Sequence, residues 1–147
     1  MMLKPGDAAP DFEVKDDKGR TVRLSDYKNK KDVLLWFYPK ADTPGCTKEG
    51  CAFRDLNREF SDKGVQVLGV SFDETGENDK FAQKFQFNFP LLSDTERKLG
   101  VAYGAADDAS ARSAKRISYL IGKDGRVRKA WDKVDAAAHP AQVLAEL

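Results

Sequence analysis

The chain of 147 residues is poor in the side chains that hold metals or cross-link small proteins. It contains only two cysteines, Cys46 and Cys51, and a single histidine, His139. A metal site usually needs three or four such ligands, so this set argues against a metal centre. A domain of this size buries about two-thirds of its unfolded surface, and it therefore needs no disulfide as a staple.

The chain also lacks an excess of charge and a long hydrophobic run. Its 25 basic and 24 acidic residues leave a net charge of +1, so we expect no nucleic-acid partner. No apolar stretch approaches the roughly 18–20 residues of a membrane span, and the first residues lack the hydrophobic region of a signal peptide. We therefore expect a cytoplasmic protein without a membrane partner, in which two cysteines are more often catalytic or metal-binding than structural.

Apolar periodicity predicts a single α/β domain over residues 1–147. Strands are expected in a hairpin within residues 12–24, at 33–38, at 65–72, in a short segment at 89–92, and in a second hairpin at 117–121 and 127–131. Helices are expected at 43–60, 77–87, 96–103 and 140–147, with a polar loop at 104–114. This order predicts a thioredoxin-like three-layer sandwich with a mixed central sheet and an N-terminal β-hairpin extension.

The first cysteine follows a helix-start signal that comes shortly after a buried strand. Thr43 is a good N-cap residue, and Pro44 suits the first helical position because its missing N–H costs nothing there. Cys46 then falls in the first turn, where unpaired backbone N–H groups and the helix dipole favour an anion. This pattern predicts a reactive thiolate at the N-terminus of a helix.

The spacing of Cys46 and Cys51 restricts how they can interact. Five residues along an intact helix separate their Cα atoms by about 8–9 Å, whereas a disulfide needs less than about 7 Å. A stapling disulfide is therefore disfavoured, and two inert buried thiols remain an alternative, more for Cys51 than for Cys46. We expect an intact helix in the reduced protein and an unwound stretch between the cysteines after oxidation.

The residues around the first cysteine resemble the active-site motif of the peroxiredoxins. The family's Pro-x-x-x-Thr-x-x-Cys appears as Pro39, Thr43 and Cys46, and a second cysteine five residues further on is similar to the PrxQ or bacterioferritin comigratory protein branch. The resemblance runs through residues 5–12, 70–73, 89–94 and 116–121. It implies a thioredoxin-like fold and the reduction of hydrogen peroxide and organic hydroperoxides without a cofactor or metal.

The resemblance also implies a role for each matching residue. Cys46 would be the peroxidatic cysteine, which peroxide oxidises to a sulfenic acid, and Cys51 would resolve it as a disulfide. Thr43 would hydrogen-bond the thiolate and the peroxide, and Pro39 would shield the pocket from water. Thioredoxin or a related dithiol would reduce the disulfide, and we expect a monomer with at most a weak dimer.

Negative charge develops on the oxygen that leaves the peroxide, so fixed hydrogen-bond donors are needed near the thiolate. Arg116 is our candidate because arginine is always charged, because it leads a strand, and because it matches the family's active-site arginine. The backbone N–H groups of Gly45 and Cys46 would join it in binding the substrate. Arg54 and Arg112 are the competing candidates for the activating charge.

Three further residues carry open interpretations. Glu49 either orients a donor at the site or is a helix-surface charge. Gly50 stands where the branch usually has alanine or a similar small residue, and a helical glycine costs about 1 kcal/mol relative to alanine. Our hypothesis is that this glycine eases the local unfolding that brings the cysteines together. His139 is expected to begin the last helix rather than to act as a base.

Two other function classes compete with a thioredoxin-dependent thiol peroxidase. A thiol–disulfide oxidoreductase usually carries Cys-x-x-Cys, which is shorter than the spacing here. A redox sensor that binds a partner when Cys46 is oxidised fits the sequence as an added role. Turnover of peroxide separates the first class from both.

Overall fold

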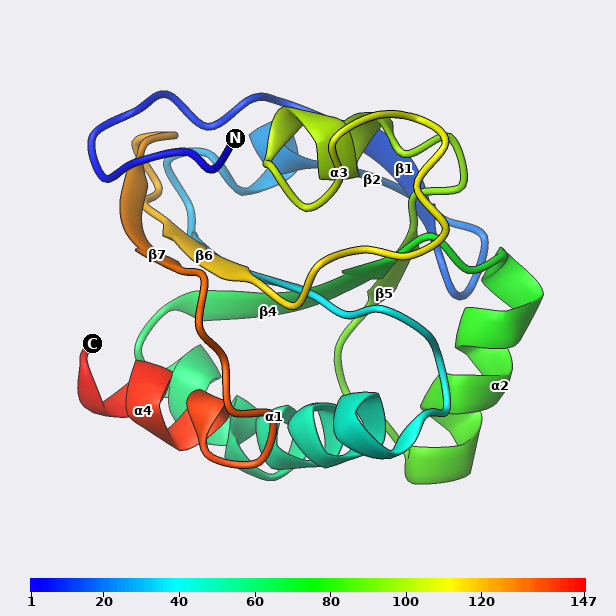
Figure 1. The fold of residues 1–147 in the computed structure, drawn as a ribbon. Coiled ribbons are helices and arrows are strands. Elements are labelled where there is room, and N and C mark those ends of the chain that lie inside the picture. The colour runs from blue at the N-terminus through cyan, green and yellow to red at the C-terminus, as the bar shows by residue number, and fades with distance from the viewer.

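The computed structural model describes residues 1–147 and has a seven-stranded mixed sheet at its centre (Figure 1). Three central strands, β5, β4 and β3, are parallel, and antiparallel strands flank them on both sides. The order across the sheet is β2-β1-β5-β4-β3-β6-β7. The strands are β1 (Glu13–Asp16), β2 (Thr21–Arg23), β3 (Asp32–Phe37), β4 (Val65–Ser71), β5 (Leu91–Ser93), β6 (Ser118–Ile121) and β7 (Val127–Trp131).

Helices cover both faces of this sheet, which gives the three layers that the sequence predicted (Figure 1). One face carries α1 (Pro44–Asp62), α2 (Thr75–Phe85) and α4 (His139–Ala145), and the other carries α3 (Lys98–Ala102) and the 3-10 helix η1 (Leu24–Tyr27). The β1–β2 hairpin forms one edge of the sheet. The arrangement is thioredoxin-like, as predicted, and the element ends differ from the predicted ones by a few residues.

The central strand β3 supplies side chains to both layers. Val33, Leu35 and Phe37 pack in the core beneath α3 and η1, whereas Leu34 and Trp36 pack in the core beneath α1 and α2. All five are buried because a strand points successive side chains to opposite faces and helices cover both faces here. This burial explains the unbroken apolar run and fixes where the strand ends.

The second helix ends earlier than predicted. The predicted helix reached residue 87, but α2 ends at Phe85 because Gln86 adopts a left-handed conformation with φ of 54°. Phe87 therefore lies outside the helix, and its ring stacks between those of Phe85 and Phe89. Phe89 is buried, so these aromatic residues pack internally.

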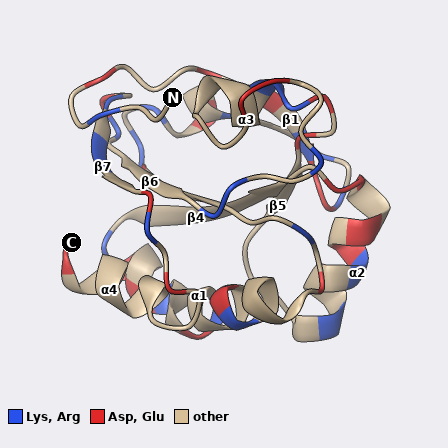
Figure 2. Cartoon of the chain, viewed as in Figure 1, with Lys and Arg blue, Asp and Glu red and all other residues tan.

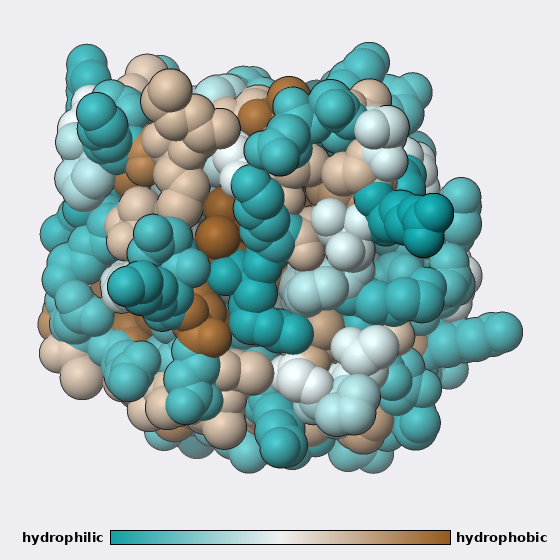
Figure 3. Space-filling model, in the orientation of Figure 1, coloured by the Kyte–Doolittle hydropathy of each residue, from teal (hydrophilic) through white to brown (hydrophobic).

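The remaining surface is dense in charge of both signs. Lys and Arg alternate with Asp and Glu over the helices and loops, and neither sign occupies a whole side of the molecule in Figure 2. The face drawn in Figure 3 is mostly hydrophilic, with small apolar areas between charged side chains. None of the helices has the length and apolar character that crossing a membrane requires.

The single histidine begins α4, as expected, and it is completely enclosed. His139 packs edge-on against the rings of Phe53 and Trp131, and neither of its ring nitrogens has a hydrogen-bond partner. Burial lowers the pKa of His139 from 6.5 to about 4, against a smaller opposing effect of the Glu146 carboxylate. The folded protein therefore holds this imidazole neutral.

A neutral buried histidine makes stability fall in mild acid. The unfolded chain binds a proton on His139 below about pH 6.5, but the folded chain does so only near pH 4, so stability falls across this interval. The loss between about pH 7 and pH 5 should be roughly 2 kcal/mol. Urea unfolding of wild type and His139→Leu at both pH values tests this. Equal pH dependence in the two proteins would contradict it.

Candidate active site

The end of β3 is fixed by a buried polar network. The hydroxyl of Tyr38 donates to Asn78 Oδ1 at 2.6 Å, and Asn78 Nδ2 donates to the hydroxyl of Ser93 at 2.8 Å. Burial raises the pKa of Tyr38 well above its ordinary value, so this hydroxyl stays a neutral donor. The network connects β3 to α2 and β5, and it sets where the chain leaves the sheet.

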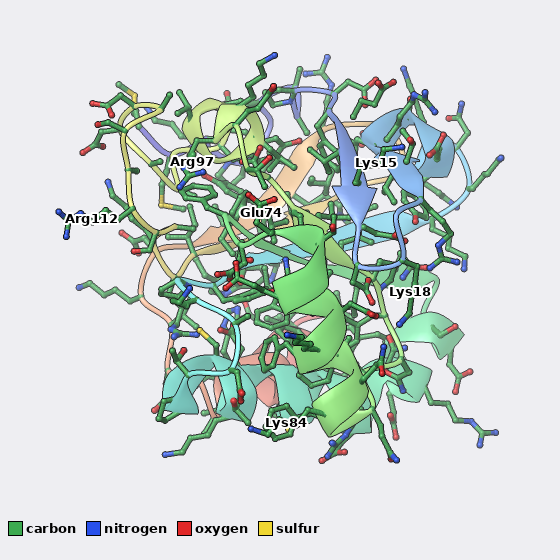
Figure 4. The ribbon with its side chains drawn as sticks, turned by 90° about the vertical axis from the view of Figure 1, so that its right-hand side faces the viewer. Lys15, Lys18, Glu74, Lys84, Arg97 and Arg112 are labelled. Atoms are coloured by element: carbon green, nitrogen blue, oxygen red, sulfur yellow. The ribbon has the colours of Figure 1, made fainter.

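The loop from β3 to α1 is held by a second set of contacts. Asp73 accepts a hydrogen bond from the backbone N–H of Ala41 at 2.8 Å and pairs with Lys40 at 3.1 Å. Asp42 has a left-handed φ of 60°, and its carboxylate pairs with Lys84, which lies at the lower end of α2 in Figure 4. These contacts fix the path of the loop and therefore the position at which α1 begins.

The first turn of α1 carries Cys46, which is completely buried. Thr43 is the N-cap residue and Pro44 the first helical residue, as predicted. The Thr43 hydroxyl, however, does not cap the helix: it donates to the carbonyl oxygen of Lys40 at 2.7 Å. Pro39 and Thr43 are half-buried beside this turn, and the contact of Thr43 with peroxide stays a prediction.

Of the three candidate arginines, the structure brings Arg116 to the thiol. Its Nη2 donates to Cys46 Sγ at 3.3 Å. Arg54 instead donates to the carbonyl oxygen of Phe85 at 2.7 Å, and Arg112 is exposed and extends away from the molecule in Figure 4. The absence of a side chain at Gly45 allows this approach, because a Cβ there would lie 3.0 Å from Arg116 Nη2.

Glu49 is completely buried and belongs to the same cluster, so its interpretation as a helix-surface charge is wrong. Its Oε1 accepts from Arg116 Nη1 at 2.7 Å, and its Oε2 has no hydrogen-bond partner. Burial raises the pKa of Glu49 to about 7, although the hydrogen bond from Arg116 opposes the rise. Burial also opposes the charge of Arg116, but its bonds to Cys46 and Glu49 outweigh that effect and raise its pKa.

The second cysteine lies in the same unbroken helix. Cys46 and Cys51 are both free thiols, and Cys51 is half-buried. The intact helix agrees with the geometry expected for the reduced protein, in which the two sulfur atoms are held apart. A disulfide between them requires the first turns of α1 to unwind.

The observed cavities and ligand sets do not indicate a second reaction centre. No group of three or more His, Cys, Asp or Glu side chains is placed to hold a metal ion. A cavity of about 350 Å³ lies between η1 and the β6–β7 turn, with Tyr27, Lys28 and Arg126 among its lining residues. It adjoins Val33 at the start of β3, at the opposite end of that strand from Cys46.

Comparison with known proteins shows the family to which the chain belongs. The model of the AhpC/TSA family matches residues 5–130. Peroxiredoxin Bcp of Bacillus subtilis is 41% identical over 152 residues, which cover 100% of this chain and 96% of that protein. The chain belongs to the AhpC/TSA family. Its relatives in this family include the putative peroxiredoxin bcp of Coxiella burnetii, which is 40% identical over the full length of both chains.

Solved structures of the same family share the fold over nearly the whole chain. Peroxidoxin BcpB of Mycobacterium tuberculosis has a TM-score of 0.90 and 36% identity, covering 99% of this chain and 96% of that one. The Xanthomonas campestris bacterioferritin comigratory protein, which is described with alkyl peroxide reduction activity, has a TM-score of 0.85 and 33% identity over 92% of this chain and 88% of that one. The resemblance to the PrxQ and bacterioferritin comigratory protein branch is confirmed.

Several residues that shape this AhpC/TSA-family site gave no signal in the sequence. Asn78 holds Tyr38 from a distant position that nothing in the local pattern marks, and Ser93, although inside a stretch that resembles the family, had no role assigned to it. Phe87 was expected in a helix, but its ring lies on Gly50, one residue before Cys51. Only a prediction of tertiary contacts could have found these residues.

Replacing Glu49 should separate its charge from its hydrogen bond. Ionisation of Glu49 above about pH 7 places a second anion on Arg116, which leaves less attraction for the Cys46 thiolate. The ratio of the Cys46 oxidation rate in wild type to that in Glu49→Gln, which keeps an acceptor but does not titrate, should therefore fall as the pH rises through about 7.

Glu49→Ala removes the acceptor that positions the Arg116 guanidinium. It should therefore slow the oxidation of Cys46 by about ten-fold, the scale of a lost charge-assisted hydrogen bond. Stopped-flow rates with hydrogen peroxide, measured from mildly acidic to mildly alkaline pH, give both results. Identical pH profiles for wild type and Glu49→Gln would show that Glu49 does not titrate at the site.

Proposed function

We propose that the chain is a thiol peroxidase that reduces hydrogen peroxide and organic hydroperoxides through Cys46. The observation that carries the proposal is a buried thiol in the first turn of a helix with the Arg116 guanidinium 3.3 Å from its sulfur. Membership of the AhpC/TSA family supports it, as does the alkyl peroxide reduction activity described for the Xanthomonas campestris relative.

In the first step the Cys46 thiolate attacks one peroxide oxygen, and the O–O bond breaks. The sulfur becomes a sulfenic acid, and the other oxygen leaves as water or an alcohol after taking a proton. Arg116 stabilises the charge on the leaving oxygen, together with the N–H groups of Gly45 and Cys46. The Thr43 hydroxyl, which now donates to Lys40, can rotate to the peroxide, and Pro39 limits the access of water.

In the second step Cys51 condenses with the sulfenic acid, which forms a disulfide and releases water. The intact helix keeps the Cα atoms too far apart for this bond, so residues 44–51 must unwind first. A dithiol of the thioredoxin class then reduces the disulfide by thiol–disulfide exchange. A slow second step exposes Cys46 to further oxidation to sulfinic acid.

The buried sulfur also bears on the competing functions. Cys46 is completely buried, with Arg116 on its sulfur, so a disulfide in a folded partner does not reach it while the helix is closed, and a small peroxide is the substrate that needs the least opening. This burial disfavours direct thiol–disulfide exchange at Cys46 in the closed helix. A sensor role is compatible with the same oxidation chemistry, and the monomeric state and cytoplasmic location stay predictions.

Replacing each cysteine should block a different step of the reaction. Cys46→Ser should consume no peroxide in an assay coupled to thioredoxin and NADPH oxidation. Cys51→Ser should reduce one equivalent of peroxide quickly and then stop, because the sulfenic acid has no resolving thiol. Absence of any peroxide reduction by fully reduced wild type would reject the peroxidase proposal.

Arg116 should contribute to the first step through its fixed donors. Arg116→Met should slow Cys46 oxidation by about 100-fold or more, the scale found when one donor to a developing anion is lost. Arg116→Lys keeps the charge but not the planar pair of donors, so it should recover only part of the rate. Single-turnover kinetics with hydrogen peroxide measure both, and a wild-type rate in Arg116→Met would contradict the assignment.

A further inference from the structure

The ring of Phe87 is seated directly on the backbone of α1 next to the second cysteine. A Cβ built on Gly50 would lie 2.5 Å from Phe87 Cζ and 3.1 Å from two other ring atoms. The ring is held from behind by Phe81, at a centroid distance of 4.8 Å, and by Phe89, at 5.2 Å. Gly50 is therefore buried by Phe87, and only glycine fits beneath the ring as it stands.

The segment that carries this ring is tied to α1 further along the helix. Arg54 donates to the carbonyl oxygen of Phe85 at 2.7 Å, and Asn57 Nδ2 donates to the carbonyl oxygen of Asn88 at 3.0 Å. Asn88 Nδ2 in turn donates to the carbonyl oxygen of Arg54 at 3.2 Å. Residues 54–57 of α1 and residues 85–88 thus form one connected unit.

Residues 44–51, in contrast, make few side-chain hydrogen bonds to the rest of the protein, although Cys46, Glu49 and Gly50 are buried. Their only side-chain hydrogen bonds run from Arg116 to Cys46 and Glu49. Oxidation of Cys46 changes the first of these bonds, because the sulfur then carries an oxygen. The contact of Phe87 with Gly50 is independent of that chemistry and still acts when the sulfenic acid has formed.

We propose that Phe87 is a positioning residue for the resolving step, which holds the Gly50 turn of α1 closed until Cys51 moves toward Cys46. Unwinding then proceeds through Gly50 and stops before Arg54, where the hydrogen bonds to residues 85–88 hold the rest of the helix. The inference rests on the proposed peroxidase function. It gives Phe87 control over how long Cys46 remains a sulfenic acid.

This control has a chemical consequence because two reactions compete for the sulfenic acid. Attack by the Cys51 thiol forms the disulfide and releases water, whereas a second peroxide adds an oxygen to give sulfinic acid and releases water or an alcohol. Tighter packing of Phe87 on Gly50 slows only the attack by Cys51. The partition between disulfide and sulfinic acid therefore reports the strength of the Phe87 contact.

The test follows both products in Phe87→Ala after reduced protein is mixed with hydrogen peroxide. Samples quenched over time with a sulfenic-acid trap are measured by mass spectrometry for trapped sulfenic acid, disulfide and sulfinic acid. Disulfide formation should be about five-fold faster than in wild type, the scale of one aromatic packing contact. The fraction of sulfinic acid at high peroxide should fall accordingly. The rate of Cys46 oxidation should change by less than about two-fold, because the loss of one aromatic contact still leaves the closed helix as the main state.

Control variants separate this role from a general loss of stability. Phe12→Ala removes a ring of the core on the opposite face of the sheet, so it should lower stability without changing the rate of disulfide formation. Phe87→Leu should lie between wild type and Phe87→Ala, and it replaces the alanine variant if that protein does not fold. A disulfide rate in Phe87→Leu or Phe87→Ala equal to or below that of wild type would overturn the proposal.

Gly50→Ala distinguishes the Phe87 contact from simple flexibility of the glycine. In the Phe87→Ala background the added methyl only favours the helix, and disulfide formation should slow by about five-fold. With Phe87 present, the methyl also displaces the ring, so the slowing should be smaller or reversed. Equal slowing in both backgrounds would show that flexibility alone acts. Failure of wild type to form any sulfenic acid would instead contradict the proposed function.

Discussion

The candidate active site depends on the guanidinium group of Arg116, which donates hydrogen bonds to two buried acidic side chains. Arg116 stands just before β6 and donates one hydrogen bond to Cys46 and another to Glu49, so it connects the sheet to the first turns of α1. The same cation favours the thiolate and stabilises Glu49 in a place where burial alone opposes its charge. The bare backbone of Gly45 lets the guanidinium approach closely enough for both bonds.

The proposed reaction places two opposed requirements on the fold around this cluster. Reduction of peroxide needs a closed first turn of α1, with the thiolate enclosed and the donors fixed before the reaction begins. Resolution needs the same turn to open, because Cys51 does not reach Cys46 along an intact helix. The structure suits both requirements, because polar contacts anchor the end of β3 and the later part of α1, whereas residues 44–51 have few side-chain hydrogen bonds beyond those of Arg116 and pack against Phe87 at Gly50.

Local signals in the sequence predicted most of the fold but only part of the site. The apolar run of β3 and the Thr43-Pro44 helix start follow from short-range rules, and both were confirmed. Arg116 was located because its motif is family-specific, although it lies 70 positions from Cys46. The sequence left Glu49 open between a donor-orienting residue and a surface charge, and the packing of Phe87 on Gly50 was missed, since both depend on segments that meet only in the folded chain.

The central proposal is that the Arg116 guanidinium, which donates to Cys46 Sγ at 3.3 Å, favours the anionic form of this sulfur. The most direct test is the ultraviolet absorbance of the thiolate in reduced Cys51→Ser, where Cys46 is the only thiol, compared with the same protein carrying Arg116→Met. The account predicts a thiolate signal at neutral pH that decreases strongly when Arg116 is replaced. An equal signal in both proteins would contradict it, and would assign the stabilisation of the anion to the N-terminus of α1 alone.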